Sequence, residues 1–327
     1  MKTLLRVAVA LVLGALIVWY AGGVRELVRS AAHPNPWYLL IASVGFMVDR
    51  GLMAFKWGLL LKSRGIAIPL FYGFKVYCAS SIWATFLPTT TGADAIRVFF
   101  ARRENVDTGE LIASVVVERA LGFLASLVMG LVALFILRQH HYWDERFRPV
   151  LWAAVLLLVG GAGAFVVSLG RTTFDTFWRW MPRRLAESWL GRKVQRLHGT
   201  YTAYGADWRA LTTVFGLTLV EQFFPILCIW LVAVSLDTPI GILFVAGVLP
   251  LTLLVARLPI SVDGLGVYEG ILIVLMGLAG VEPATAVSIA LIGRVVQVLS
   301  YLPWWAVFTI ETRHIKPPRV GVGYGPG

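Results

Sequence analysis

Residues 257–270 read RLPISVDGLGVYEG, and they interrupt an apolar sequence with one proline, three glycines and three charged residues. Proline removes a backbone donor and glycine frees the backbone torsions, so a helix unwinds where these residues gather. Apolar segments at about 239–256 and 265–280 flank the stretch and are typical of transmembrane helices. The stretch therefore predicts a break in helical structure at membrane depth.

The composition of the whole chain excludes a water-soluble globule. Hydrophobic residues make up 58% of the 327 residues and charged residues only 14%, whereas a soluble domain carries about a quarter charged residues. A helix crosses the hydrocarbon core with roughly 20 residues. We predict an all-α polytopic membrane protein with about eight transmembrane helices in one domain over residues 1–316, followed by a tail at 317–327. The other spans are expected at about 7–21, 37–61, 111–137, 149–169, 211–235 and 284–310.

The basic residues orient these spans. The net charge is +11, but Lys and Arg lie in short loops rather than on one compact face, which argues against nucleic-acid binding. The polar segment 171–210 holds eight Lys or Arg residues, whereas the loops near Asp237 and Glu282 hold none. The positive-inside rule then predicts an inner (cytoplasmic) membrane protein with both termini and 171–210 on the cytoplasmic side. We expect segment 171–210 to lie against the membrane surface.

This orientation requires residues 68–96 to begin and end on the same side of the membrane. The segment contains two apolar runs, but not two full spans. The economical interpretation is a re-entrant hairpin buried in protein or lining a wet cavity. An amphipathic helix on the membrane surface is the alternative, and Lys75 would suit it.

A second stretch resembles the first. Residues 86–103 read FLPTTTGADAIRVFFARR, and both stretches have Leu-Pro, small or polar residues, a glycine and then an acid, Asp94 or Glu269. Each is followed by an apolar helix with an embedded arginine, Arg119 or Arg294. The two prolines lie 171 residues apart and the two arginines 175. Because the two helices are expected to run in opposite directions, we predict an inverted repeat whose broken helices mark a transporter's binding site.

Buried cations indicate what such a site would bind. The free N–H groups of a half-helix favour anions, and the guanidinium fork of arginine matches phosphate oxygens. A charge in lipid costs several kcal/mol unless it is paired or hydrated. We therefore predict a polar chamber that binds a lipid phosphate headgroup, with no metal and no cofactor. The cations expected near it are Arg50, Arg97, Arg119, Arg257 and Arg294.

Ion pairing without any ligand is the alternative for these charges. Adjacent residues project about 100° apart on a helix, so Glu118 and Arg119 are expected to pair with other helices rather than with each other. A purely internal salt bridge, such as Glu118 with Arg294, stays open.

Four further charged residues also have two interpretations. Asp49 and Arg50 would fit the cytoplasmic interface, with Lys56 snorkelling towards water, or they belong to the chamber. Glu221, which precedes Pro225, is either the partner of an arginine or a proton site.

Three motifs, LPTTTGADAIR, VVVERALGF and LPISVDGLGVYEG, resemble in order and spacing the flippase-like transmembrane region of lysylphosphatidylglycerol synthases, which also occurs as a stand-alone family. The resemblance covers about residues 37–310 and implies a lipid-translocating helical domain with re-entrant elements. The family commonly has different residues where Ala93, Asp263 and Tyr268 stand, which affects the choice of headgroup. The positions that it highlights are Pro88, Gly92, Asp94, Arg97, Glu118, Arg119, Pro259, Ser261, Gly264, Gly266 and Glu269.

The sequence leads to a first hypothesis of a flippase or transporter that moves a phosphate-bearing lipid, either a phospholipid or a polyprenyl-phosphate-linked lipid, between leaflets. Because the soluble aminoacyl-transferring domain of the full synthases does not occur in these 327 residues, we do not expect an enzyme. Two alternatives remain open: a membrane-embedded lipid headgroup transferase, and an accessory subunit of a lipid-modifying enzyme. The expected partners are the membrane and its anionic lipids, with a second copy of the chain or a lipid-modifying enzyme left open.

Overall fold

A computed structural model describes residues 15–85, 92–102, 107–140, 142, 145, 147–170, 188–256 and 266–312. The elements among these residues are all helices, which confirms the predicted all-α polytopic class. Within the described ranges, five segments are long and apolar enough to cross a membrane. They are α3 (Pro36–Lys62), α6 (Thr108–Gln139), α7 (Phe147–Ser168), α11 with α12 (Trp208–Glu221 and Phe223–Ser235), and α15 (Pro283–Thr312).

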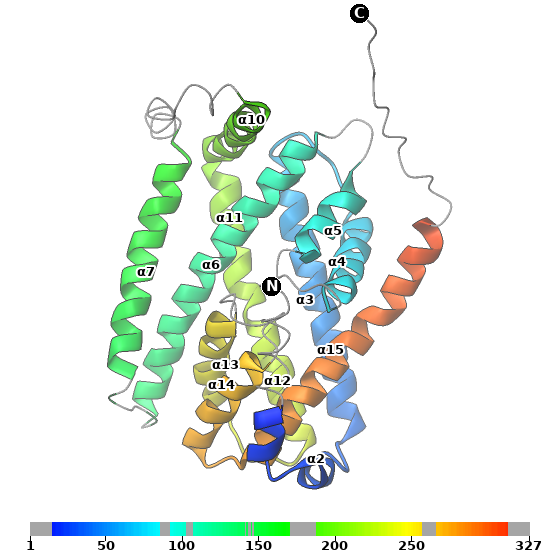
Figure 1. Ribbon diagram of the computed structural model, residues 1–327, viewed down its shortest axis with the longest axis vertical. Helices are drawn as coiled ribbons and strands as arrows, with labels where there is room; N and C mark the ends of the chain where they lie inside the picture. Colours follow the sequence, from blue (N-terminus) through cyan, green and yellow to red (C-terminus); the bar gives the residue numbers. More distant parts are fainter. Residues whose placement is uncertain are drawn as a thin grey trace, which may run out of the picture.

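The long helices run along the long axis of the molecule (Figure 1). The helix α10 (Trp189–Ala203) lies across one end of the bundle, and the short helix α2 (Val24–Ser30) lies at the other (Figure 1). We call these the α10 end and the α2 end. The expected tail 317–327, most of the expected first span and residues 171–187 lie outside the described residues.

An ion pair ties three elements together at the α10 end. Arg64 follows α3, and its guanidinium donates to both carboxylate oxygens of Glu110 on α6, at 3.0 and 3.2 Å. The same guanidinium lies 5.8 Å from the ring centre of Tyr204, in the turn between α10 and α11. The hydrogen bond to Glu110 raises the pKa of Arg64, so the guanidinium stays charged.

The segment predicted as a re-entrant hairpin forms two short helices, α4 (Leu70–Thr85) and α5 (Gly92–Ala101). They pack against each other (Figure 1), and the Tyr72 hydroxyl donates to the Phe100 carbonyl at 2.6 Å, which joins the start of α4 to the end of α5. With 16 residues, α4 is about 24 Å long and shorter than the roughly 30 Å hydrocarbon core. We call α4 and α5 the first hairpin.

The alternative of a surface helix is wrong for α4. Val76, Cys78 and Ala79 are fully buried. The side chain of Lys75 is also buried and forms an ion pair with Glu311 near the end of α15. Because α4 packs on α3 and α15 as well as on α5, it is an internal element of the bundle.

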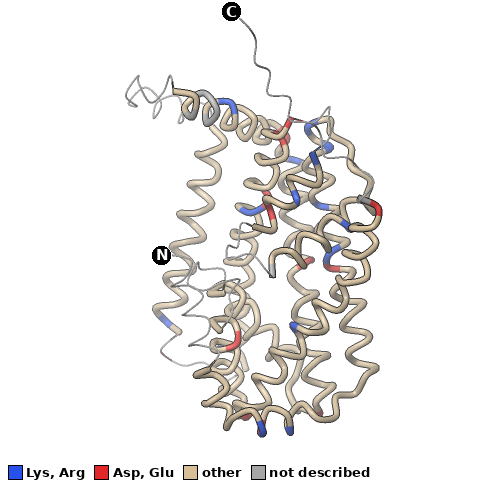
Figure 2. The backbone as a smooth tube through the Cα atoms, turned by 45° about the vertical axis from the view of Figure 1, so that its right-hand side comes forward, with Lys and Arg blue, Asp and Glu red and all other residues tan. Residues whose placement is uncertain are grey.

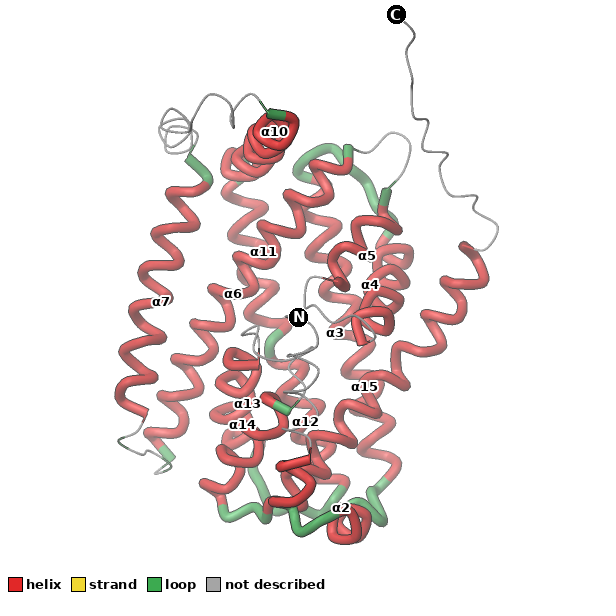
Figure 3. Tube along the Cα trace, in the orientation of Figure 1, coloured by secondary structure: helices red, strands yellow, loops and turns green. Residues whose placement is uncertain are grey.

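The second pair of short helices differs from the two full spans that we expected. Helices α13 (Ile242–Ala256) and α14 (Val267–Met276) have 15 and 10 residues, too few for a perpendicular crossing. They pack against each other in the half of the bundle next to α2 (Figure 3). Their apolar composition resembles that of a span because they are buried by neighbouring helices. We call this pair the second hairpin.

Glycine contacts give the direction of α13. Gly247 faces Leu137, and Gly130 of α6 faces Leu251 and Leu254. The two helices therefore run antiparallel. Because α6 ends at the α2 end (Figure 1), α13 starts there and ends beside the middle of α6. The first hairpin opens towards the α10 end instead (Figure 1). The two hairpins therefore enter the bundle from opposite ends, as the inverted-repeat hypothesis requires.

The close contact between α13 and α6 yields a stability prediction. A Cβ at Gly247 would lie 2.9 Å from Leu137 Cδ2 and 3.5 Å from the Ala133 carbonyl oxygen, whereas one at Gly163 of α7 would meet nothing within 4 Å. Gly247→Val should destabilise the protein by about 1–3 kcal/mol through overpacking. Thermal unfolding in detergent measures this effect, with Gly163→Val as the matched control. Equal unfolding temperatures for both variants would show that α13 does not pack against α6 in this way.

Candidate functional site

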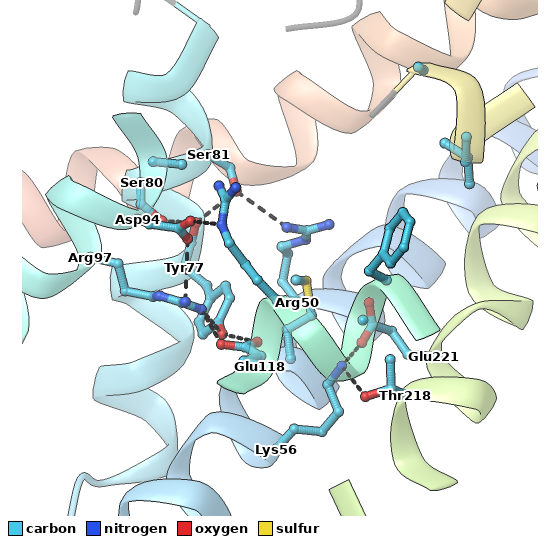
Figure 4. Close-up of a pocket in the computed structure, with 17 residues that line it drawn as sticks. Arg50, Lys56, Tyr77, Ser80, Ser81, Asp94, Arg97, Glu118, Thr218 and Glu221 are labelled. Atoms are coloured by element: carbon cyan, nitrogen blue, oxygen red, sulfur yellow. Dashed lines mark hydrogen bonds and ion pairs between the residues drawn. The ribbon is translucent and has the colours of Figure 1, made fainter. Parts of the chain in front are cut away.

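The bundle contains a partly open cavity of about 560 Å³ (Figure 4). Helices α3, α4, α5, α6 and α11 contribute its polar lining, and Leu253 and Ala256 from the end of α13 line it too. The first hairpin and the end of α13 therefore reach one cavity. Figure 2 shows acidic and basic residues close together inside this region. The polar lining residues are Arg50, Lys56, Tyr77, Ser80, Ser81, Asp94, Arg97, Glu118, Arg119, Thr218 and Glu221.

Arg97 is a buried cation of this cavity with two carboxylate partners. Its side chain is 4% exposed, and its guanidinium pairs with Glu118 at 2.7 Å and with Asp94 at 3.3 Å. The guanidinium lies 4.6 Å from the ring centre of Tyr77 and 5.0 Å from that of Trp57. The Tyr77 hydroxyl accepts a hydrogen bond from Arg97 and donates one to Glu118 at 2.6 Å. Arg97 thus has two carboxylates and two aromatic faces, a set that offsets the cost of burying its charge.

Arg119 belongs to the same cluster but is accessible. It pairs with Asp94, which it shares with Arg97. Its side chain is 46% exposed and lines the cavity. The expectation that Glu118 and Arg119 pair with another helix is confirmed, because both pair with residues of α5. Arg97 holds the cluster together, and Arg119 presents charge to the cavity.

A second cation, Arg50, lies on α3. It pairs with Asp49 at 2.9 Å, donates to Ser81 of α4 at 3.4 Å, and lies 5.3 Å from the ring centre of Tyr301 on α15. Asp49 is 2% exposed. Arg50 lines the cavity, as the interpretation that it belongs to the chamber requires. The hydrogen bond to Ser81 connects α3 to the second half of α4.

Lys56 forms the remaining basic position. It pairs with Glu221 and donates to the Thr218 hydroxyl at 3.1 Å, both on α11 (Figure 4). Lys56 is 2% exposed, so the interpretation of a snorkelling lysine is wrong. Glu221 does pair with a cation, as one of its two interpretations required, but the cation is a lysine. A single sequence does not indicate which helix faces α3, so this pair was missed.

Arg294 and Glu269 form a separate ion pair. Arg294 on α15 meets Glu269 on α14 at 3.3 Å, and neither is among the described residues that line the cavity. The suggested bridge between Glu118 and Arg294 is wrong, because each has another partner. Glu269 also accepts a hydrogen bond from the Gly266 backbone N–H at 2.7 Å. Gly266 has φ of +80°, so a glycine begins α14 without strain.

The two ion pairs repeat one pattern. Asp94 and Glu269 each lie in the first turn of the second helix of a hairpin. Each pairs with an arginine 25 residues later, Arg119 or Arg294, on the long helix that follows. This equal spacing is visible in the sequence and would have paired the residues correctly. It supports the inverted repeat at the level of side-chain contacts.

Five of the predicted positions lie outside the described residues: Pro88, Arg257, Pro259, Ser261 and Gly264. Gly92 is buried at the first position of α5. Of the predicted charged set, the structure brings Asp94, Arg97, Glu118 and Arg119 to one cavity. It places Glu269 and Arg294 in another cluster.

Short helical hairpins around a charged cavity, set among helices long enough to span a membrane, define a polytopic all-α membrane protein. The sequence matches the family described as lysylphosphatidylglycerol synthase TM region over residues 5–304. The chain belongs to this family, as the three motifs predicted.

Three curated relatives align with this chain over most of their length. A UPF0104 membrane protein of Methanocaldococcus jannaschii is 20% identical over 84% of each chain. A UPF0104 membrane protein of Methanothermobacter thermautotrophicus is 21% identical over 90% of each chain. A third, from Pyrococcus horikoshii, is 20% identical over 91% of this chain and 93% of its own. The chain is thus similar to these archaeal membrane proteins over almost their whole length.

The Arg97 cluster yields a second stability prediction. Glu118→Ala should cost about 3–5 kcal/mol, because it removes the closest carboxylate from a buried guanidinium. The control is Glu145→Ala, which breaks an ion pair with Arg148. The side chains of Glu145 and Arg148 are 72% and 68% exposed, so this substitution should change stability little. Thermal unfolding of both variants in detergent tests this difference. Wild-type stability of Glu118→Ala would contradict the assigned role of the pair.

Proposed function

We propose that this protein is a lipid flippase that moves a phosphate-bearing lipid between the two leaflets and does not itself modify that lipid. The observation that carries the proposal is the half-exposed guanidinium of Arg119 in a cavity where the first hairpin and the end of α13 meet. Phospholipids and polyprenyl-phosphate-linked lipids share the phosphate that such a group recognises. Membership of the lysylphosphatidylglycerol synthase TM family supports a role with lipids.

The lining of the cavity suits an amphiphile. Arg119 and Arg50 lie on its polar side, and Met53, Phe123 and Leu253 add apolar surface. A headgroup can exchange its hydration for charge-assisted hydrogen bonds there, while apolar side chains contact the adjoining glycerol or acyl carbons. Both features are needed to lower the barrier that a hydrated phosphate meets in hydrocarbon.

The two hairpins supply a route from either leaflet. They enter from opposite ends and each pairs an acid with an arginine on the next long helix. In transporters built from inverted repeats, one repeat moves relative to the other around a fixed site. We infer that the two hairpins open the cavity alternately towards the two sides, with the cavity as the fixed site.

We propose further that the α10 end is cytoplasmic and that the protein lies in the inner membrane with both termini in the cytoplasm. Lys62, Arg64 and Arg196 lie at the α10 end, whereas Asp237 and Glu282 lie in the loops at the α2 end. The α2 end also carries Arg25 and Arg29 on α2. The proposal therefore depends on segment 171–210, which includes α10 and holds eight Lys or Arg residues, under the positive-inside rule. The exposed Trp189 at the start of α10 supports contact with the membrane surface.

Substitution of Arg119 tests the proposal. In proteoliposomes that contain a fluorescently labelled phosphatidylglycerol, wild-type protein should accelerate leaflet exchange, measured by quenching of the outer leaflet. Arg119→Ala should reduce the accelerated rate about 10–100-fold, since hydrogen bonds to charged groups contribute about 1.5–3 kcal/mol each. The fold should persist, because Asp94 still pairs with Arg97.

The matched control is Arg209→Ala, at an exposed arginine near the start of α11 that does not line the cavity. It should exchange lipid at the wild-type rate. Exchange by the wild type at the rate of empty liposomes, for labelled phospholipids and polyprenyl phosphates alike, would refute the proposed function.

A further inference from the structure

The two basic sides of the cavity hold their counter-ions differently. On the α5 side, Asp94 pairs with both Arg97 and Arg119, and Glu118 is held by Arg97 and Tyr77. A phosphate that takes Arg119 from Asp94 leaves that carboxylate paired with Arg97. No carboxylate on this side is left without a cation.

The carboxylate on the α11 side has fewer cationic partners. Among the described residues, Glu221 has one cationic partner, Lys56. The carboxylate side chain is 15% exposed, and Lys56 is 2% exposed. Lys56 donates to the Thr218 hydroxyl and to Glu221. An anion that takes the place of Glu221 on Lys56 would leave this carboxylate in a largely dehydrated position without a cation. Burial disfavours the charged form of a carboxyl group, so the displaced group becomes a proton acceptor.

We propose that Lys56 is a second phosphate-binding residue and that Glu221 takes up one proton from water when phosphate replaces it on Lys56. This inference rests on the proposed function and assigns a proton to the transport cycle. No covalent bond changes: the phosphate–ammonium pair forms, the carboxylate–ammonium pair breaks, and the proton neutralises the carboxylate. Departure of the lipid restores the original pair and releases the proton.

The other charged and titratable groups around the cavity do not substitute for Glu221. Asp49 pairs with Arg50, and Asp94 and Glu118 keep Arg97. Thr218 on α11 and Gln222 directly after α11 are neutral, and Gln222 donates to Ser126 of α6 at 2.9 Å. The charged and titratable groups that line the cavity with Glu221 are Arg50 and Lys56 from α3, Tyr77 from α4, Asp94 and Arg97 from α5, and Glu118 and Arg119 from α6, and Asp49 pairs with Arg50.

Linkage sets the sign of the pH effect. If the lipid-bound protein holds one more proton than the empty protein, affinity must rise as pH falls. The change approaches about tenfold per pH unit where Glu221 is ionised in the empty protein and protonated in the complex. An uncoupled site would show equal affinity over the same range.

Calorimetry of the intact protein in detergent tests the inference, with short-chain phosphatidylglycerol as the probe. Titrations in two buffers of different ionisation enthalpy should give uptake of close to one proton per bound lipid near neutral pH. Glu221→Gln should remove both the uptake and the pH dependence, and should bind the probe more tightly because Lys56 is no longer neutralised. Glycerol 3-phosphate, a second probe, distinguishes a site for phosphate itself from a site that also requires acyl chains; proton uptake with either probe supports the inference.

The matched control is Glu311→Gln, which breaks the pair with Lys75 on α4 outside the cavity lining and should leave proton uptake unchanged. Binding by the wild type without proton uptake, or undiminished uptake by Glu221→Gln, overturns the inference. Leaflet exchange on the same preparation is scored separately. Lipid exchange without proton uptake would overturn this inference alone. If neither probe binds and no lipid exchange occurs, both proposals are overturned.

Discussion

The organisation of this protein depends on keeping the guanidinium of Arg97 charged inside a membrane bundle. A lone charge there would cost several kcal/mol, and the chain surrounds it with Glu118, Asp94 and two aromatic rings. These partners come from α3, α4, α5 and α6. The ion cluster therefore fixes the first hairpin against the long helices, and the short helices stay at membrane depth because their charges are satisfied there.

The second hairpin uses the same contact for a different result. Asp94 with Arg119 and Glu269 with Arg294 have the same 25-residue spacing and the same place in the first turn of a helix. The Asp94 pair faces the cavity and leaves its arginine 46% exposed, whereas Arg294 is 26% exposed. One copy of the contact thus leaves its arginine accessible from the cavity, and the other chiefly secures the start of α14. The two hairpins share the ion pair but differ in how exposed its arginine is.

The sequence predicted what depends on membrane thickness and on local breaks. Loop charges required residues 68–96 to begin and end on the same side of the membrane, which led to the first hairpin. The RLPISVDGLGVYEG stretch marked the break between α13 and α14. The short length of the second hairpin was missed, because apolar residues buried by protein and residues facing lipid have the same composition. Lys56 was misassigned for a related reason: whether a lysine in an apolar helix snorkels or pairs depends on the helix opposite, here α11 with Glu221.

Charge balance explains why this cavity would couple lipid to protons. The described cations that line it, Arg50, Lys56, Arg97 and Arg119, are matched by Asp94, Glu118 and Glu221 in the lining and by Asp49 behind Arg50. An empty cavity of this kind is close to neutral, which a low-dielectric interior requires. A phosphate brings a net negative charge that the existing pairs cannot absorb by rearrangement alone. A proton restores neutrality, and the carboxylate with a single cationic partner accepts it at the lowest cost.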